Sequence, residues 1–264
     1  MSEGQADVVL VETIGATKLV TMNRPAARNA LTREVLAKLR GAIDAASSDP
    51  AIRCVILGGA GGHFCAGADL RQNILDDPQF MEHLEVYMDV FHGLIKCVVR
   101  CSKPTIAMMD GAAVGFGADL AFSCDLRIAS TRSYAQEKFV SIGLMPDGGG
   151  TFWLPRLVGT ARAMQMILLA ERVDGPELHR LGVVAQVVDA ETLREKALEM
   201  ARRIEAGPPL AFAAIKRSLY ASHGSIEDAL CREREEQLRL LRSADAMEGV
   251  TAWMQKRPPR FEGK

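Results

Sequence analysis

Three short apolar runs constrain the fold more than any other feature of this 264-residue chain. They read AIRCVILGG at residues 51–59, PTIAMMDG at 104–111 and CDLRIAS at 124–130. Runs of this length and composition predict buried strands. Because helical patterns accompany each of them, the sequence predicts an α/β chain in which strands alternate with helices.

The segments on either side of these runs predict further elements. Residues 7–13 and 18–25 indicate two strands joined by a glycine-containing turn, a hairpin. From Thr32 onward, apolar residues recur with helical spacing as far as Asp49 and Pro50, so Thr32 is expected to cap a helix. After about residue 175 the pattern is almost wholly helical. We therefore expect an α/β core over residues 1–200 and a helical oligomerisation region over residues 201–264.

The composition argues against several classes of protein. The formal net charge is −1, which gives no electrostatic reason to bind nucleic acid or an anionic membrane. No run of about eighteen apolar residues occurs, and the first residues lack a secretory pattern. The six cysteines form no CxxC pair, and the five histidines form no HxxxH or HExxH pattern. We therefore expect a cytoplasmic protein with reduced thiols and no metal site.

Two glycine-rich segments follow predicted strands and suggest chemistry. GGAGGHFCAGADLRQN spans residues 58–73, and DGAAVGFGADLAFSCD spans residues 110–125. Glycine permits tight turns, and backbone amides at such turns can bind developing negative charge. The two loops can therefore supply two donors to one oxygen, as in an oxyanion hole, although a tight strand–helix connection explains the glycines equally well. Neither segment matches a GxxxxGK[ST] phosphate loop, and the chain has no GxSxG nucleophile motif.

Two aspartates are candidate acid/base groups. Asp147 lies in GLMPDGGGTFWLPRLVG, residues 143–159, where three glycines follow it and its other neighbours are mostly apolar. Partial burial raises the pKa of a carboxyl group towards neutrality and suits it to carry a proton. Asp119, in the second glycine segment, is the other candidate. It is equally well interpreted as a first-turn aspartate that complements a helix dipole.

Five segments, in this order, carry a resemblance to a known family: NRPAARNALT, HFCAGADL, DGAAVGFGADLAFSCDLRIAS, GLMPDGGGTFWLPRLVG and WMQKRPPRFEGK. From about residue 8 to 263 the chain resembles the enoyl-CoA hydratase/isomerase family, the crotonase superfamily. The resemblance implies a crotonase-like spiral of ββα units with helices at the C-terminus that pack a homotrimer or a dimer of trimers. It also implies an acyl-CoA thioester substrate, in which coenzyme A is part of the substrate, and no separate cofactor.

The resemblance assigns residues to the site as well. The backbone N–H groups of Ala68 and Phe116 match the two oxyanion-hole donors. The positions that match CoA contacts are Ala27, Arg28, Ala66, Asp69, Leu70, Trp253 and Lys256. Arg28 is expected to meet a phosphate, and Trp253 and Lys256 to reach a CoA bound on the adjacent subunit. Arg28 and Lys256 are also explained as solvated charges, and Trp253 as an interface anchor.

The sequence departs from the hydratases of this family, which use two glutamates. Asp119 occupies the first glutamate position with a side chain one methylene shorter, and Phe139 occupies the second. Glu137 lies two positions out of register and remains a candidate. Asp147 lies where several isomerases of the superfamily carry their single acid/base. These include ring-opening isomerases of phenylacetate breakdown, which have a similar GLxPDxGG segment.

The favoured hypothesis is double-bond isomerisation of an enoyl-CoA, because one carboxylate suffices for a 1,3 proton shift. Asp147 would move the proton, and Asp119 would assist or hold a water. The acyl pocket is expected to include Phe139, Phe152 and Trp153, which suits an aromatic or branched acyl group, although the last two are also explained as core residues. One alternative is a hydratase, a hydro-lyase, that uses Asp119 with Asp147 or another acid. Another is a weakly catalytic acyl-CoA-binding or scaffold protein.

Overall fold

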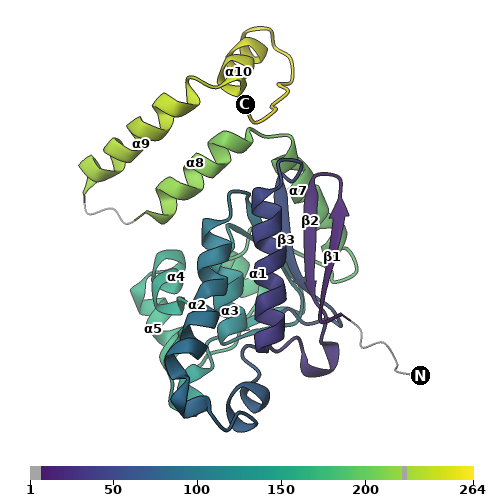
Figure 1. The fold of residues 1–264 in the computed structure, drawn as a ribbon, viewed down its shortest axis with the longest axis vertical. Coiled ribbons are helices and arrows are strands. Elements are labelled where there is room, and N and C mark those ends of the chain that lie inside the picture. Colours follow the sequence, from purple (N-terminus) through teal and green to yellow (C-terminus); the bar gives the residue numbers. More distant parts are fainter. Residues whose placement is uncertain (1–6, 222–224) are drawn as a thin grey trace.

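The computed structural model describes residues 7–221 and 225–264 and has a mixed α/β architecture with two sheets (Figure 1). The larger sheet contains, in spatial order, β1 (Val9–Ile14), β2 (Thr17–Met22), β3 (Cys54–Gly59), β4 (Thr105–Met109), β6 (Leu126–Ser130) and β9 (Gln186–Val188). The smaller sheet contains β5 (Ala112–Val114), β7 (Tyr134–Gln136) and β8 (Val173–Asp174). The three apolar runs of the sequence form β3, β4 and β6, so their prediction as buried strands is confirmed.

The larger sheet begins with an antiparallel pair and continues in parallel. Ile14 of β1 pairs with Thr17 of β2 across a turn at Gly15, whose φ of 61° suits glycine. This confirms the predicted hairpin. The pairs β2–β3, β3–β4, β4–β6 and β6–β9 are all parallel. Because parallel neighbours end at the same edge, the two glycine segments that follow β3 and β4 are brought together there.

Successive turns of the chain place one strand in each sheet and then form a helix. β4 leads into β5 and α3 (Phe116–Ser123), and β6 leads into β7 and α4 (Gly150–Val158). β4 pairs with β6 in the larger sheet, and β5 pairs with β7 in the smaller sheet. This repetition is the expected spiral of ββα units.

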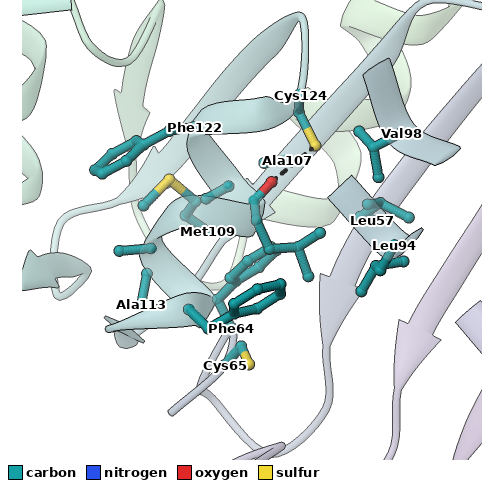
Figure 2. Packing of buried hydrophobic residues seen from close by; sticks show 14 of the residues in the cluster. Leu57, Phe64, Cys65, Leu94, Val98, Ala107, Met109, Ala113, Phe122 and Cys124 are labelled. Carbon is teal, nitrogen blue, oxygen red and sulfur yellow. Dashed lines mark hydrogen bonds between the residues drawn. The ribbon is translucent and has the colours of Figure 1, made fainter. Parts of the chain in front are cut away.

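One face of the larger sheet is covered by α1 (Arg33–Ser48) and α2 (Leu84–Arg100). The Thr32 hydroxyl accepts a hydrogen bond from the Val35 amide, so the predicted helix cap is confirmed. Buried side chains of both helices join one core with the sheet. Figure 2 shows Leu94 and Val98 of α2 next to Leu57 of β3 in this core.

The opposite face is covered by α7 (Leu193–Glu205). Its buried Leu193, Ala197 and Ala201 form a second core with alternate strand residues such as Cys54 and Ile56 of β3. The predicted division of the chain at residue 200 falls within this helix. The helices that stand away from the sheets in Figure 1 begin only with α8.

The remaining elements are α5 (Thr160–Leu168), α6 (Gly175–Arg180), α8 (Pro209–Tyr220), α9 (Ile226–Leu240) and α10 (Ala244–Met254), with short turns at Pro25–Ala27, Arg71–Leu75, Phe80–Glu82 and Phe139–Ile142. The helices α8, α9 and α10 form a layer at one end of the molecule (Figure 1). Leu219, Leu230 and Trp253 are exposed apolar side chains of this layer. Within the described ranges, no helix has the length and apolar character needed to cross a membrane.

Candidate active site

The loop that follows β3 leaves one backbone donor free. The Leu31 amide donates to the Gly67 oxygen at 2.8 Å, and the Asp69 amide donates to the Leu31 oxygen at 2.9 Å. The amide of Ala68, between these two partners, donates no backbone hydrogen bond within residues 7–221 and 225–264. Ala68 also lines a mostly apolar cavity. Its N–H group is therefore available to a ligand.

The helix α3 supplies a second free donor at its first residue. The Phe116 amide has no backbone acceptor in the described part of the chain, as expected for the first N–H of a helix. A methyl group built on Gly67 would lie 3.5 Å from the Phe116 nitrogen and 2.7 Å from the Val114 oxygen. Only glycine at position 67 lets the two loops approach so closely. Two free amides beside one cavity are the arrangement that an oxyanion hole requires.

A cavity of about 590 Å³ borders both loops. Ala68 and Phe116 lie in its wall, and most of the remaining lining is apolar. The larger apolar side chains in the wall include Leu70, Ile74, Phe80, Tyr87, Phe91 and Phe139. A cavity of this size and polarity suits the acyl part of a small ligand.

One wall of the cavity is aromatic. Consecutive ring centroids of Phe80, Tyr87, Phe91 and Phe116 are 5.3, 4.7 and 4.8 Å apart. Tyr87 and Phe91 come from one face of α2, four residues apart. Burial raises the pKa of Tyr87 to about 12, so its phenol is neutral at physiological pH. These aromatic residues of α2 were not among those predicted for the acyl pocket. The apolar spacing along α2 could have indicated a helix face that is buried against the site.

Asp147 lies in the cavity wall and is the only carboxyl group there among the described residues. Its Oδ1 atom is buried and has no hydrogen-bond partner in the described chain. Burial raises the pKa of Asp147, and the nearby His92 acts in the opposite direction. Such a carboxylate is both accessible to a bound ligand and poised to accept a proton.

The three glycines after Asp147 are each explained by a close contact. A methyl group on Gly148 would lie 2.6 Å from Asp119 Cβ, and one on Gly150 would lie 2.6 Å from Asp119 Oδ1. Gly149 has a φ of 99°, and a methyl group there would lie 2.6 Å from Trp153 Nε1. The loop can therefore pack directly against Asp119 only because its side chains are absent.

Asp119 and Glu137 are both fully buried and do not line the cavity. Asp119 Oδ2 accepts a hydrogen bond from the Gly148 amide at 2.8 Å. The methyl group built on Gly150 would lie 3.0 Å from Glu137 Oε1, so the two carboxyl groups meet at this glycine. The structure thus brings Asp119 together with Glu137, the out-of-register candidate, and neither lines the cavity, whereas Asp147 does.

Of the three aromatic residues predicted for the acyl pocket, Phe139 lies in the cavity wall, whereas Phe152 and Trp153 do not. Phe152 is 39% exposed, and the guanidinium of Arg156 lies over its ring at 3.6 Å. The Trp153 ring packs edge-on against Tyr220. The other aromatic residues of the wall come from α2, the turn before it and the first residue of α3.

Four of the predicted CoA contacts lie together at one side of the cavity. Ala66 and Leu70 are part of its wall. The Ala66 amide donates to the Arg28 oxygen at 2.9 Å, which joins the segment of Ala27 and Arg28 to the glycine loop. The Arg28 side chain is exposed. A solvent-facing guanidinium beside the cavity is suited to a phosphate.

The other predicted CoA contacts have different surroundings. The Asp69 carboxylate pairs with Arg24 at 2.9 Å and accepts a hydrogen bond from the Gln72 amide, so it is occupied within its own chain. Trp253, on α10, is 85% exposed, and Lys256 follows the same helix. Neither lines the cavity of its own chain.

No group of three or more histidine, cysteine, aspartate or glutamate side chains that could hold a metal ion occurs in the described ranges. His223, one of the five histidines considered in the sequence analysis, and residues 1–6 lie outside them.

Comparison with known proteins finds relatives along nearly the whole chain. Residues 12–264 match the family model described as enoyl-CoA hydratase/isomerase. The chain is 36% identical over 247 residues to the 1,2-epoxyphenylacetyl-CoA isomerase of Escherichia coli, covering 93% of this chain and 94% of that protein. Its identity to a probable enoyl-CoA hydratase of Rhodobacter capsulatus is also 36% over 247 residues, with the same coverage of 93% and 94%.

Solved structures give the same result for the fold. An enoyl-CoA hydratase from Bacillus anthracis matches with a TM-score of 0.92 at 28% identity, covering 98% of this chain and 100% of that one. The crotonase-like spiral expected from the sequence is thereby confirmed. Because the similar proteins include both isomerases and hydratases by name, the comparisons identify the family and leave the reaction open. The chain belongs to the enoyl-CoA hydratase/isomerase family.

Proposed function

We propose that this protein isomerises the double bond of an enoyl-CoA, with Asp147 as the single acid/base. The observation that supports this proposal is that Asp147 is the one carboxyl group in the cavity wall among the described residues. Its carboxyl group borders the cavity, where it can accept a proton from a bound substrate, and its buried Oδ1 atom has no hydrogen-bond partner in the described chain. A single carboxylate is sufficient for a 1,3 proton shift, because the proton that it removes can be returned at another carbon.

The proposed reaction begins with a 3-enoyl-CoA whose thioester oxygen accepts hydrogen bonds from the Ala68 and Phe116 amides. Asp147 removes a proton from the carbon next to the thioester, and the electron pair moves onto the thioester oxygen to form a conjugated enolate. The two amides stabilise this oxyanion and can each contribute about 3 kcal/mol in comparable sites. Asp147 then returns the proton at the far end of the former double bond, which leaves a 2-enoyl-CoA. No atom is gained or lost.

The wall composition supports a bulky apolar acyl group, such as one with a ring. The rings of Tyr87 and Phe91 present a continuous apolar surface, and the cavity volume is about 590 Å³. On the CoA side, Arg28 is the proposed phosphate contact. Trp253 and Lys256 are proposed to act on the CoA of an adjacent subunit in a homotrimer or a dimer of trimers, since both are remote from the cavity wall of their own chain.

Hydration is the second candidate, because several similar proteins are named as hydratases. It requires a water held for attack at C3 and a second group to manage its proton. Asp119 and Glu137 are the acidic candidates for that role, but neither lines the cavity, and Asp119 is bonded to the Gly148 amide. The hydratase alternative therefore needs one of these carboxyl groups to reach the cavity.

The test uses purified protein with a 2-enoyl-CoA and a 3-enoyl-CoA, each carrying a phenyl group, in water enriched in heavy oxygen. Mass spectrometry is expected to show a shifted double bond with no oxygen gained. Asp147→Asn is expected to lower the rate by at least about a thousandfold, because it removes the only proposed base. Incorporation of label at C3, lost in Asp119→Asn and retained in Asp147→Asn, would identify a hydratase instead. Tight binding of either substrate without turnover would support the weakly catalytic alternative.

A further inference from the structure

Asp119 and Glu137 form a buried acidic pair with no basic partner. Asp119 Oδ1 and both carboxyl oxygens of Glu137 are buried and lack a hydrogen-bond donor in the described chain. The Gly148 amide binds Asp119 Oδ2 at 2.8 Å, and the Gly150 amide also lowers the pKa of Asp119. Two ionised carboxylates buried this close together, without a cation beside them, would repel each other strongly.

A proton shared between the two carboxyl groups removes this electrostatic repulsion. When one carboxyl group is protonated, its O–H can donate to the other, and the pair carries one negative charge. Burial raises the pKa of both groups. The Gly148 amide donates to Asp119, whereas neither carboxyl oxygen of Glu137 has a donor in the described chain, so the negative charge is better placed on Asp119 and the proton on Glu137. The negative charge of the nearby Asp147 also raises the pKa of both Asp119 and Glu137, which disfavours a second negative charge on the pair.

The pair is also placed to fix the catalytic loop. The amide that binds Asp119 belongs to Gly148, the residue directly after Asp147. The helix α4 begins two residues later, at Gly150, and a methyl group there would lie 2.6 Å from Asp119 Oδ1 and 3.0 Å from Glu137 Oε1. A helix N-terminus favours one nearby negative charge. The single charge of the pair therefore holds both the loop and the start of the helix.

We propose that Glu137 and Asp119 share one proton at neutral pH and act as a positioning pair that holds Asp147 in the cavity wall. Glu137 donates to Asp119, and the ionised Asp119 binds the Gly148 amide. Neither residue touches the substrate. The part of this inference that concerns Asp147 rests on the proposed isomerase function, whereas the shared proton does not.

The shared proton is tested without substrate. The infrared spectrum of the wild-type protein at neutral pH is expected to show the carbonyl stretch of one buried protonated carboxylic acid, which Glu137→Gln removes. Between about pH 5 and 7, unfolding of the wild type is expected to release about one proton more than unfolding of Glu137→Gln. Glu195→Gln, a change at an exposed residue of α7, is the matched control and is expected to behave as wild type.

The positioning role is tested by a pair of variants at residue 137. Glu137→Leu removes the donor and is expected to lower kcat by about tenfold to a hundredfold with little change in KM, because Asp147 moves within an intact cavity. Glu137→Gln retains an N–H donor and is expected to restore most of the lost kcat. In the wild type, kcat is expected to fall at alkaline pH as the pair loses its proton, and this fall is absent in Glu137→Gln.

Different results would overturn the two parts separately. An infrared spectrum and a proton count that are the same in wild type and Glu137→Gln would refute the shared proton, whatever the reaction. A fall in kcat that is equal in Glu137→Leu and Glu137→Gln, with an unchanged pH profile, would refute positioning through the pair. Absence of isomerase activity in the wild type, with the infrared band present, would remove the proposed function and leave the shared proton in place.

Discussion

Replacing Gly67 with alanine is expected to damage the site without removing a reactive side chain. Gly67 has a φ of 93°, a conformation that residues with a Cβ atom rarely adopt. The added methyl group would also lie 2.7 Å from the Val114 oxygen and 3.5 Å from the Phe116 nitrogen. Because these contacts are with backbone atoms, they can be relieved only by moving one loop away from the other. The Ala68 and Phe116 amides would then no longer point at one oxygen.

The size of the effect follows from these contacts. Backbone strain at a position that requires positive φ costs about 1–3 kcal/mol, and overpacking costs a similar amount. We therefore expect Gly67→Ala to lower the free energy of unfolding by about 2–5 kcal/mol. Displacement of the two donors by about 1 Å is expected to lower kcat/KM by about a hundredfold.

Gly182→Ala is the matched control. Gly182 has a φ of 75°, and a methyl group there would meet no atom within 4 Å, so only the cost of the backbone conformation remains, about 1–2 kcal/mol. Urea unfolding of each variant, followed by tryptophan fluorescence, measures stability, and the isomerase assay measures kcat/KM. If Gly67→Ala matched Gly182→Ala in both measurements, the packing of Gly67 against the second loop would not be what aligns the two donors.

Three further changes test other parts of the structure. A pH–rate profile is expected to show kcat/KM falling as the pH drops through the pKa of Asp147, because only the ionised carboxylate accepts a proton. Burial raises this pKa, so the fall begins at a higher pH than it would for an exposed aspartate. Phe91→Ala removes a fully buried ring from the cavity wall and is expected to lower the free energy of unfolding, measured in urea, by about 3–5 kcal/mol. The same change is expected to raise KM more for a phenyl-bearing acyl-CoA than for a short one. Lys216→Met leaves the partly buried Asp125 without the cation that lies 2.7 Å from it, and is expected to cost about 3–5 kcal/mol in the same unfolding assay with kcat unchanged.

Elements with a local burial pattern could be predicted from the sequence. β3, β4 and β6 are short apolar runs, and α1 has a capping residue, an apolar stripe and a proline after its end. The strands of the smaller sheet could not be predicted in this way. β5, β7 and β8 have three, three and two residues, which is too short for a periodic pattern. They form only because the larger sheet brings their ends together.

The same distinction applies to the site. Asp147, Ala68 and Phe116 could be predicted as site residues because each lies in a recognisable segment. The partnership of Asp119 and Glu137 could not be read from the sequence, because it depends on the alignment of β5 with β7, where Ala113 pairs with Ala135. That pairing places the end of β7 beside the start of α3. In the sequence, Glu137 was only a carboxylate two positions out of register.

The arrangement also indicates where this family can change its reaction. The proposed oxyanion donors are backbone groups, so they tolerate different side chains at positions 68 and 116 and serve any reaction that develops an enolate. What differs between isomerisation and hydration is how many carboxyl groups reach the substrate. Here a buried pair already exists outside the cavity wall, and the Gly148 amide is bonded to its Asp119. A change from one reaction to the other would therefore depend on whether a carboxyl group of this pair reaches the cavity, and the glycines after Asp147 are what let the loop pack against Asp119.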